Sequence, residues 1–130
     1  VVVPAASVAA RWLRCTEPEA RVVCEQAARI LSSDELQRFF NPADYQSAHN
    51  ELELVHEGDW LRIDRLVLFE DALWVLDYKR QVFVQQQTDY WQQLARYRAA
   101  CEALFPGKPV HSALITVDGR LWPSEDNTPA

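Results

Sequence analysis

The sequence predicts an α/β fold with a mixed central sheet flanked by helices, and three changes in hydrophobic period indicate it. Apolar residues recur at helical spacing in the N-terminal part, alternate with polar residues from about residue 50, and return to helical spacing from Thr88 to Leu104. A further apolar strand follows this helix. Helices, a three-stranded meander, a helix and a strand in this order predict a mixed sheet covered by helices.

The boundaries of these elements divide the chain into three parts. We expect helices within residues 5–40, with a break at Pro18. The predicted strands cover residues 50–56, 60–69, 72–79, 110–117 and 121–122. The 130 residues have room for one domain, with a helical N-terminal part over 1–45, a sheet-and-helix core over 46–122 and a loose polar tail over 123–130.

The composition restricts the classes of function. A net charge of −6 and a pI of about 5.0 argue against a broad basic face for nucleic acid, whereas acidic clusters can hold divalent cations. No apolar run approaches the roughly 20 residues that span a bilayer, and three widely spaced cysteines without zinc-site spacing are typical of a reducing compartment. We therefore expect a cytoplasmic protein without a membrane partner. The chain has three glycines and no glycine-rich phosphate loop, so it carries no ATP-binding motor.

Two neighbouring strands of the predicted meander bring charged residues together. A two-residue turn at Glu70-Asp71 would place Asp64 opposite Asp77 and Arg62 opposite Lys79, all on one face of the sheet. Carboxylates that face each other beside apolar residues repel and are costly to bury, and a divalent cation such as Mg²⁺ removes both costs. Lys79 would then stabilise negative charge on a phosphate or help to deprotonate an attacking water.

The same residues also have a simpler interpretation. An acidic side chain near a basic one is common on surface strands, where the two form a solvated ion pair. A three-residue turn would also move Asp77 opposite Arg65 and make an ordinary cross-strand ion pair. What favours the catalytic interpretation is the order of the surrounding motifs.

Three segments together resemble the PD-(D/E)xK nuclease superfamily, in particular the C-terminal nuclease domain of RecB-like and AddA-like helicase-nucleases of the UvrD/Rep type. They are Leu61-Arg62-Ile63-Asp64-Arg65-Leu66-Val67, Trp74-Val75-Leu76-Asp77-Tyr78-Lys79 and Gln93-Leu94-Ala95-Arg96-Tyr97. These match an Asp after a hydrophobic residue, a D-Y-K on the next strand and a Q-x-x-x-Y on the following helix. The segment Asn50-Glu51-Leu52-Glu53-Leu54 resembles the family's glutamate-bearing strand more weakly.

The resemblance implies a restriction-endonuclease-like fold and a deoxyribonuclease of the exonuclease V kind that uses Mg²⁺ or Mn²⁺. Asp64 and Asp77 would bind the metal together with the backbone carbonyl of Tyr78, and Lys79 would serve catalysis. Gln93 and Tyr97 would help to hold DNA or the lysine. The resemblance also implies DNA as partner, helicase motor domains with their ATP site in a longer parent chain, and a second subunit in DNA repair.

Two departures from the family pattern leave alternatives open. Leu61 stands where the family usually has a glycine, and no helix bearing a His or Glu metal ligand is recognisable in residues 1–40, where Glu25 is the nearest candidate. We expect that ligand to lie before Val1, which would leave the isolated fragment inactive. The alternatives are a catalytically inactive domain that docks DNA or a partner subunit, and a stand-alone resolvase or restriction-type enzyme.

Overall fold

The computed structural model describes residues 3–124, in which five strands form one mixed sheet in the order β1-β2-β3-β4-β5. The strands are β1 (Ser47–His56), β2 (Asp59–Leu68), β3 (Leu73–Lys79), β4 (Val110–Thr116) and β5 (Leu121–Pro123). β3 and β4 run parallel, and the other neighbours are antiparallel. The predicted α/β class with a mixed sheet flanked by helices is confirmed.

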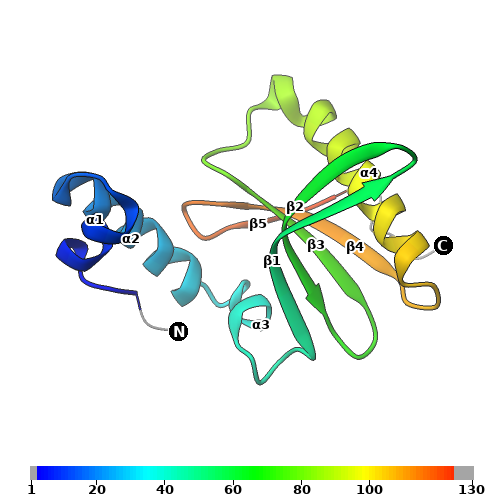
Figure 1. The fold of residues 1–130 in the computed structure, drawn as a ribbon, viewed down its shortest axis with the longest axis horizontal. Helices are drawn as coiled ribbons and strands as arrows, with labels where there is room; N and C mark the ends of the chain where they lie inside the picture. The colour runs from blue at the N-terminus through cyan, green and yellow to red at the C-terminus, as the bar shows by residue number, and fades with distance from the viewer. Residues whose placement is uncertain (1–2, 125–130) are drawn as a thin grey trace.

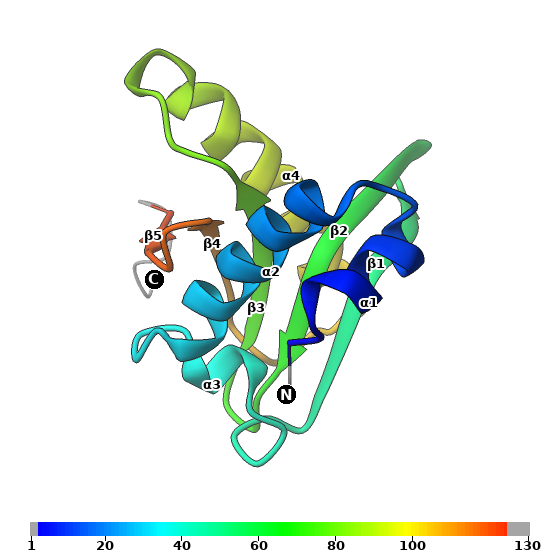
Figure 2. The ribbon, with the colours of Figure 1, turned by 90° about the vertical axis from the view of Figure 1, so that its left-hand side faces the viewer.

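The helices lie on both sides of this sheet, as Figures 1 and 2 show. They are α1 (Ala6–Leu13), α2 (Glu17–Ser32), α3 (Gln37–Phe40), the short 3₁₀ helix η1 (Val84–Gln86) and α4 (Gln87–Leu104). α4 connects the parallel strands β3 and β4 and packs on one face, whereas α3 and the end of α2 pack on the other. α1 packs mainly against α2.

The break that Pro18 predicts lies between α1 and α2. Arg14 ends α1 in the left-handed conformation, and Thr16 caps α2 through a reciprocal capping box with Glu19. Pro18 occupies the first turn of α2, where its missing N–H has no partner to lose. The helix therefore begins at the predicted place.

Two apolar clusters hold the layers together. One lies between the sheet and α4 and includes Leu66, Leu73, Val75, Leu94 and Leu114. The other lies between the sheet and α3 and includes Leu36, Phe39, Val67, Leu76 and Ile115. Neighbouring residues of one strand belong to opposite clusters because strand side chains alternate between the two faces. The sheet is therefore covered on both faces at its centre.

The strand ends differ slightly from the predicted ones. β1 begins at Ser47, because the backbone already pairs there with Leu68, although no alternation of polar and apolar residues signals it. Pro123, placed in the loose tail by the sequence, belongs to β5, and the Ser124 N–H donates to the Ser112 carbonyl at 2.9 Å. The rest of the predicted tail, residues 125–130, lies outside the described residues.

The turn between β4 and β5 packs against the end of α2. Gly119 has φ +85°, and the Ser33 hydroxyl donates to its carbonyl at 2.6 Å. A Cβ at Gly119 would lie 2.9 Å from the Arg29 carbonyl oxygen of α2, too close for a carbon atom. Glycine at this position therefore allows α2 to approach the sheet.

We predict that Gly119→Ala destabilises the protein more than Gly58→Ala. Gly58 has a similar φ of +83° but open space around its Cα, so alanine there costs only backbone strain, about 1 kcal/mol. At position 119 the contact with Arg29 adds to this strain, and we expect a loss of about 2–3 kcal/mol in the free energy of unfolding. Urea denaturation measures both losses, and equal losses would show that the close approach of α2 has no energetic consequence.

Candidate metal and catalytic site

The predicted register of β2 and β3 is confirmed. Leu68 pairs with Leu73 and Leu66 pairs with Val75, and the Phe69 N–H donates to the Ala72 carbonyl at 2.8 Å. The turn therefore contains two residues, Glu70 and Asp71, as the sequence predicts. The three-residue turn that would place Asp77 opposite Arg65 does not occur.

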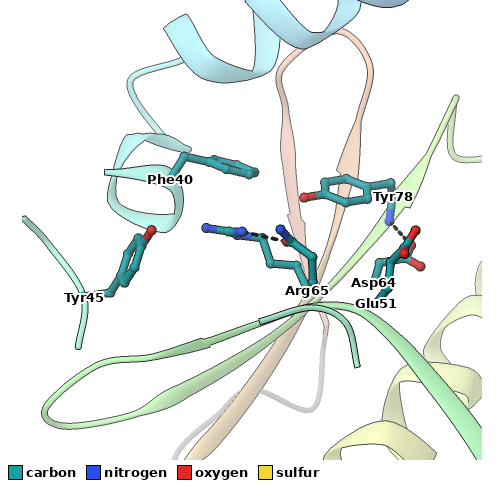
Figure 3. A pocket seen from close by; sticks show the side chains of 7 residues that line it. Phe40, Tyr45, Glu51, Asp64, Arg65 and Tyr78 are labelled. Carbon is teal, nitrogen blue, oxygen red and sulfur yellow. Dashed lines mark hydrogen bonds between the residues drawn. The ribbon is translucent and has the colours of Figure 1, made fainter. Parts of the chain in front are cut away.

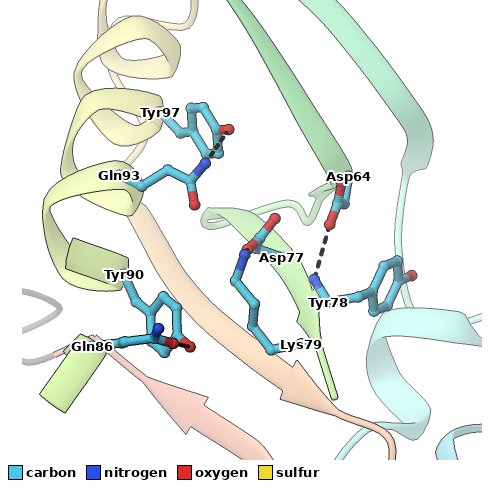
Figure 4. Close-up of polar contacts among 8 residues, drawn as sticks. All are labelled: Asp64, Asp77, Tyr78, Lys79, Gln86, Tyr90, Gln93 and Tyr97. Carbon is cyan, nitrogen blue, oxygen red and sulfur yellow. Dashed lines mark hydrogen bonds and ion pairs between the residues drawn. The ribbon is translucent and has the colours of Figure 1, made fainter. Parts of the chain in front are cut away.

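The ladder between β2 and β3 ends just before the acidic residues. Its last pair is Arg65 and Leu76, so Asp64 and Asp77 are not paired through their backbones as predicted. The next hydrogen bond of a continued antiparallel ladder would run from the Tyr78 N–H to the Ile63 carbonyl. Instead the Tyr78 N–H donates to Asp64 Oδ2 at 2.9 Å, as Figure 4 shows. The Asp64 side chain thus joins two strands that have begun to separate.

The alternation of β2 also changes at Asp64. Leu61 and Ile63 lie in the same apolar cluster as Leu66, so odd-numbered positions before Asp64 and even-numbered positions after it face α4. Arg62 consequently points away from Lys79 and makes an ion pair with Glu51 at 2.9 Å. The prediction that Arg62 faces Lys79 is therefore wrong. It assumed that side chains alternate regularly along the whole of β2, whereas the alternation is interrupted at Asp64.

Glu51 lies at the same irregularity, on the neighbouring strand. Its φ is +52°, which is unfavourable for a residue with a Cβ. The residues on either side of it, Asn50 and Leu52, pair with Arg65 and Ile63, so the strand continues past this point. The strained backbone of Glu51 thus lies beside the point where the hydrogen-bond ladder between β2 and β3 ends.

Asp77 and Lys79 form the buried part of the site. The Lys79 Nζ lies 2.9 Å from Asp77 Oδ2 in an ion pair, and the side chains of Lys79 and Asp77 are 28% and 7% exposed. Burial, together with hydrogen bonding to Asp64, raises the pKa of Asp77 from 3.8 to about 6, although Lys79 acts in the opposite direction. The cost of burial, with the neighbouring Asp64, therefore outweighs the favourable effect of Lys79 on the Asp77 carboxylate.

The pKa of Lys79 moves upward. Burial acts to lower it, but hydrogen bonding and charge interaction with Asp77, and the charge of Asp64, outweigh that effect. Lys79 is therefore an ammonium group at neutral pH. Its chemistry in this arrangement is that of a positive charge and a hydrogen-bond donor.

The two predicted residues of α4 lie across from the carboxylates, as Figure 4 shows. The Gln93 side-chain amide donates to the Tyr97 hydroxyl at 3.0 Å. Burial raises the pKa of the Tyr97 hydroxyl, and the charges of Asp77 and Asp64 raise it further. The structure therefore brings Asp64, Asp77, Lys79, Gln93 and Tyr97 together at one end of the sheet.

Two further residues of the site were not predicted from the sequence. Lys79 Nζ lies 5.3 Å from the centre of the Tyr90 ring, within range of a cation–π contact, and the Tyr90 hydroxyl donates to Gln86 at 2.5 Å. Tyr90 precedes Gln93 by three residues and so shares its helix face. This spacing from Gln93 is the sequence signal that could have identified Tyr90.

The donor chemistry fits a divalent cation of the Mg²⁺ type in part. Asp77 offers a buried carboxylate, Asp64 lies beside it, and oxygen ligands are those that Mg²⁺ prefers. No group of three or more His, Cys, Asp or Glu side chains that could hold a metal occurs within residues 3–124. Glu25, the candidate for an upstream ligand, is exposed on α2. The described residues thus provide two carboxylates.

A pocket of about 690 Å³ opens on the other side of Asp64. Its lining residues are Phe40, Tyr45, Asn50, Glu51, Asp64, Arg65 and Tyr78, most of which Figure 3 labels. The Arg65 guanidinium forms the fixed centre of this wall, because it donates to the Phe39 carbonyl at 2.8 and 3.1 Å and to Asn50 Oδ1 at 2.7 Å. Asp64 therefore belongs both to the carboxylate pair and to the pocket.

Comparison with known proteins adds no relative. The sequence matches no protein-family model, and none of the curated proteins has a similar sequence. Across residues 3–124 no helix has the length and apolar character needed to cross a membrane. The resemblance described above therefore depends on the three motifs and on the arrangement of their residues.

We predict that Asp77→Asn stabilises the protein at pH 8. Because the pKa of Asp77 is about 6 in the folded state and 3.8 as an unperturbed group, folding favours the protonated form, and the free energy of unfolding falls as pH rises from about 4 to 6. Asparagine lacks this ionisation, so the variant should be more stable than the wild type by about 1–3 kcal/mol at pH 8.

Denaturant unfolding at pH 4 and pH 8 measures this difference, which should become small at pH 4. Asp71→Asn, in the exposed turn, is the matched control and should leave stability nearly unchanged at both values. A variant Asp77→Asn that is less stable than the wild type at pH 8 would contradict the assignment of Asp77 as an electrostatically costly residue.

Proposed function

We propose that this chain is a metal-dependent nuclease domain that hydrolyses phosphodiester bonds in DNA. The observation that supports it is the meeting of two carboxylates from neighbouring strands, Asp64 and Asp77, with the ammonium group of Lys79. These groups are costly to bury together, so the arrangement is better explained by a ligand than by stability. A divalent cation would compensate the two carboxylates, and a phosphate would compensate the Lys79 ammonium.

Each residue has a role that follows from its position. Asp64 and Asp77 would hold Mg²⁺ or Mn²⁺, with the Tyr78 backbone carbonyl as a further oxygen ligand. Such an ion, when bound, lowers the pKa of water and stabilises charge on phosphate oxygens. Lys79 is protonated, so of the two roles that the sequence left open we propose the electrostatic one, in which it stabilises the negative charge that develops on the phosphate.

Gln93 and Tyr97 would position the substrate from α4. Their side chains are already hydrogen-bonded to each other, which reduces the freedom that they would lose on binding. The neighbouring ring of Tyr90 restrains the Lys79 ammonium from the same helix. We propose that α4 acts as a rigid support for the lysine and for a phosphate next to it.

The wider setting follows from the resemblance to RecB-like proteins. We propose that the chain is part of a cytoplasmic helicase-nuclease in DNA repair, with motor domains that bind ATP elsewhere in the parent protein and with a second repair subunit as partner. The restriction-endonuclease-like character of the fold belongs to the same proposal. The observed mixed sheet with a helix between two parallel strands is compatible with it.

A second candidate is a nuclease-like domain without catalysis that docks DNA or a partner subunit. Two observations favour it: residues 3–124 contain no three-ligand metal group, and the net charge is −6. In this case Lys79 and Asp77 would remain only as an ion pair. The two candidates differ in whether Lys79 is needed for a chemical step.

Substitution of Lys79 tests the proposal directly. Tested within the parent protein with Mg²⁺ or Mn²⁺, the domain should cleave single-stranded DNA, and Lys79→Ala should reduce the cleavage rate by about 100-fold or more while leaving Mn²⁺ binding in place. Lys108→Ala is the matched control, because Lys108 lies near the opposite end of β3 and donates to the Phe69 carbonyl. Cleavage is measured on denaturing gels.

The outcome that contradicts the proposal is equally specific. A parent protein that binds Mn²⁺ but cleaves no DNA, or a Lys79→Ala variant as active as Lys108→Ala, would favour the docking module. Isothermal titration with Mn²⁺ supplies the second measurement. Asp77→Asn should abolish Mn²⁺ binding, whereas Asp71→Asn should not.

A further inference from the structure

The pocket beside Asp64 has a composition that the proposed metal site does not use. Aromatic rings from three separate elements line it: Phe40 from α3, Tyr45 from the segment before β1, and Tyr78 from β3. Figure 3 shows that Arg65 lies between Phe40 and Tyr45, with Tyr78 on the other side. Its volume of about 690 Å³ is in the range of pockets that bind small ligands.

Contacts with Arg65 hold the rings of Phe40 and Tyr45 in place. The Arg65 guanidinium lies 4.7 Å from the centre of the Phe40 ring and 5.8 Å from that of Tyr45, and its own hydrogen bonds go to Phe39 and Asn50. Arg65 is 7% exposed, so this planar group cannot swing out to bind a phosphate. It instead fixes the rings for a flat partner.

Charge determines which part of a nucleotide fits. The Asp64 carboxylate lies at the pocket, and the Arg65 guanidinium already donates to Phe39 and Asn50. Without a metal ion, Asp64 disfavours a phosphate inside the pocket, whereas the charge of Glu51 is paired with Arg62. An uncharged flat ring is accepted by the aromatic wall, with the Asn50 side chain and the Tyr45 hydroxyl at the same pocket as polar contacts.

Position connects this pocket to the candidate site. Asp64 lines the pocket, and the residue that donates to its carboxylate, Tyr78, provides one of the aromatic rings. Asp77, the residue before Tyr78 in β3, faces the other side and forms an ion pair with Lys79. The gap where β2 and β3 separate therefore lies between the pocket and the two carboxylates.

We propose that the pocket binds one unpaired nucleobase of single-stranded DNA, while the phosphate attached to that nucleotide lies at Asp64 and Asp77. The inference rests on the proposed nuclease function and adds a substrate class to it. A base in a duplex has both faces covered by its neighbours, whereas an unpaired base can leave the stack and place its face against an aromatic ring. The pocket thus selects single strands or opened ends over intact duplex.

The test compares binding of two oligonucleotides in Ca²⁺, an oxygen-binding cation used here to support binding in place of Mg²⁺. One is a thymidine hexamer, and the other is the same backbone with every base replaced by a tetrahydrofuran abasic unit. For the wild type we expect about tenfold tighter binding of the hexamer with bases, because stacking contributes roughly 1–3 kcal/mol per base. Fluorescence anisotropy measures both affinities.

Tyr45→Ala should reduce this preference to about two- or threefold and leave binding of the abasic strand unchanged. Tyr45 is half-buried and lies outside helices and strands, and a second variant, Phe40→Leu, removes a different ring and should act in the same direction. Trp12→Ala is the matched control, since Trp12 is an aromatic residue of α1 that is 72% exposed and does not line the pocket. It should keep the full preference.

The outcomes separate this inference from the proposed function. A preference that is the same in the wild type, Tyr45→Ala and Phe40→Leu overturns the nucleobase pocket, even if the chain cleaves DNA. A preference that depends on Tyr45, in a chain whose parent protein cleaves no DNA, supports the pocket and contradicts the nuclease. A chain that binds neither oligonucleotide overturns both, and points to a partner protein as the occupant of the pocket.

Discussion

The hydrogen bond from the Tyr78 backbone to the Asp64 carboxylate is the interaction on which the arrangement of the candidate site depends. It takes the place of a backbone hydrogen bond between β2 and β3, at the level where the ladder ends. If the ladder continued, Asp64 and Asp77 would be fixed directly opposite each other. Because the strands separate, Asp64 lies at the gap and contributes both to the carboxylate pair and to the aromatic pocket.

The electrostatics of the site are consistent with carboxylate charge that the protein itself does not fully compensate. Burial and the neighbouring Asp64 keep the pKa of Asp77 well above that of an ordinary aspartate, although Lys79 is only 2.9 Å away. Lys79 itself is held in its charged form. In a solvent-exposed ion pair, the neighbouring lysine would instead lower the pKa of the carboxylate. This difference is why we interpret the group as a ligand site, with the strained backbone of Glu51 as a second cost at the same level.

Much of this arrangement could be predicted from the sequence, and the exceptions have a physical cause. The turn at Glu70-Asp71 fixes the register of β2 and β3, so the meeting of Asp64 and Asp77 followed from counting residues. Helical spacing placed Gln93 and Tyr97 on one face of α4. The predicted orientation of Arg62 was wrong because the side-chain alternation of β2 is interrupted at Asp64. No local residue pattern indicates where the hydrogen-bond ladder between β2 and β3 ends.

The pocket was not predicted because its residues are far apart in the sequence. Phe40 and Tyr45 precede the sheet, and they meet Arg65 and Tyr78 only through the packing of α3 on the sheet. Arg65 was considered only as a possible ion-pair partner, yet its donors go to a backbone carbonyl and an amide. Contacts of this kind depend on tertiary structure, which periodicity does not describe.

Anomalous diffraction from crystals soaked in Mn²⁺ would test the central claim most directly. The account predicts one strong peak between the carboxylates of Asp64 and Asp77, next to the Tyr78 backbone, and the loss of that peak in crystals of Asp77→Asn. Crystals that show no peak there, or an unchanged peak in the variant, would contradict the assignment of these two residues as a metal site.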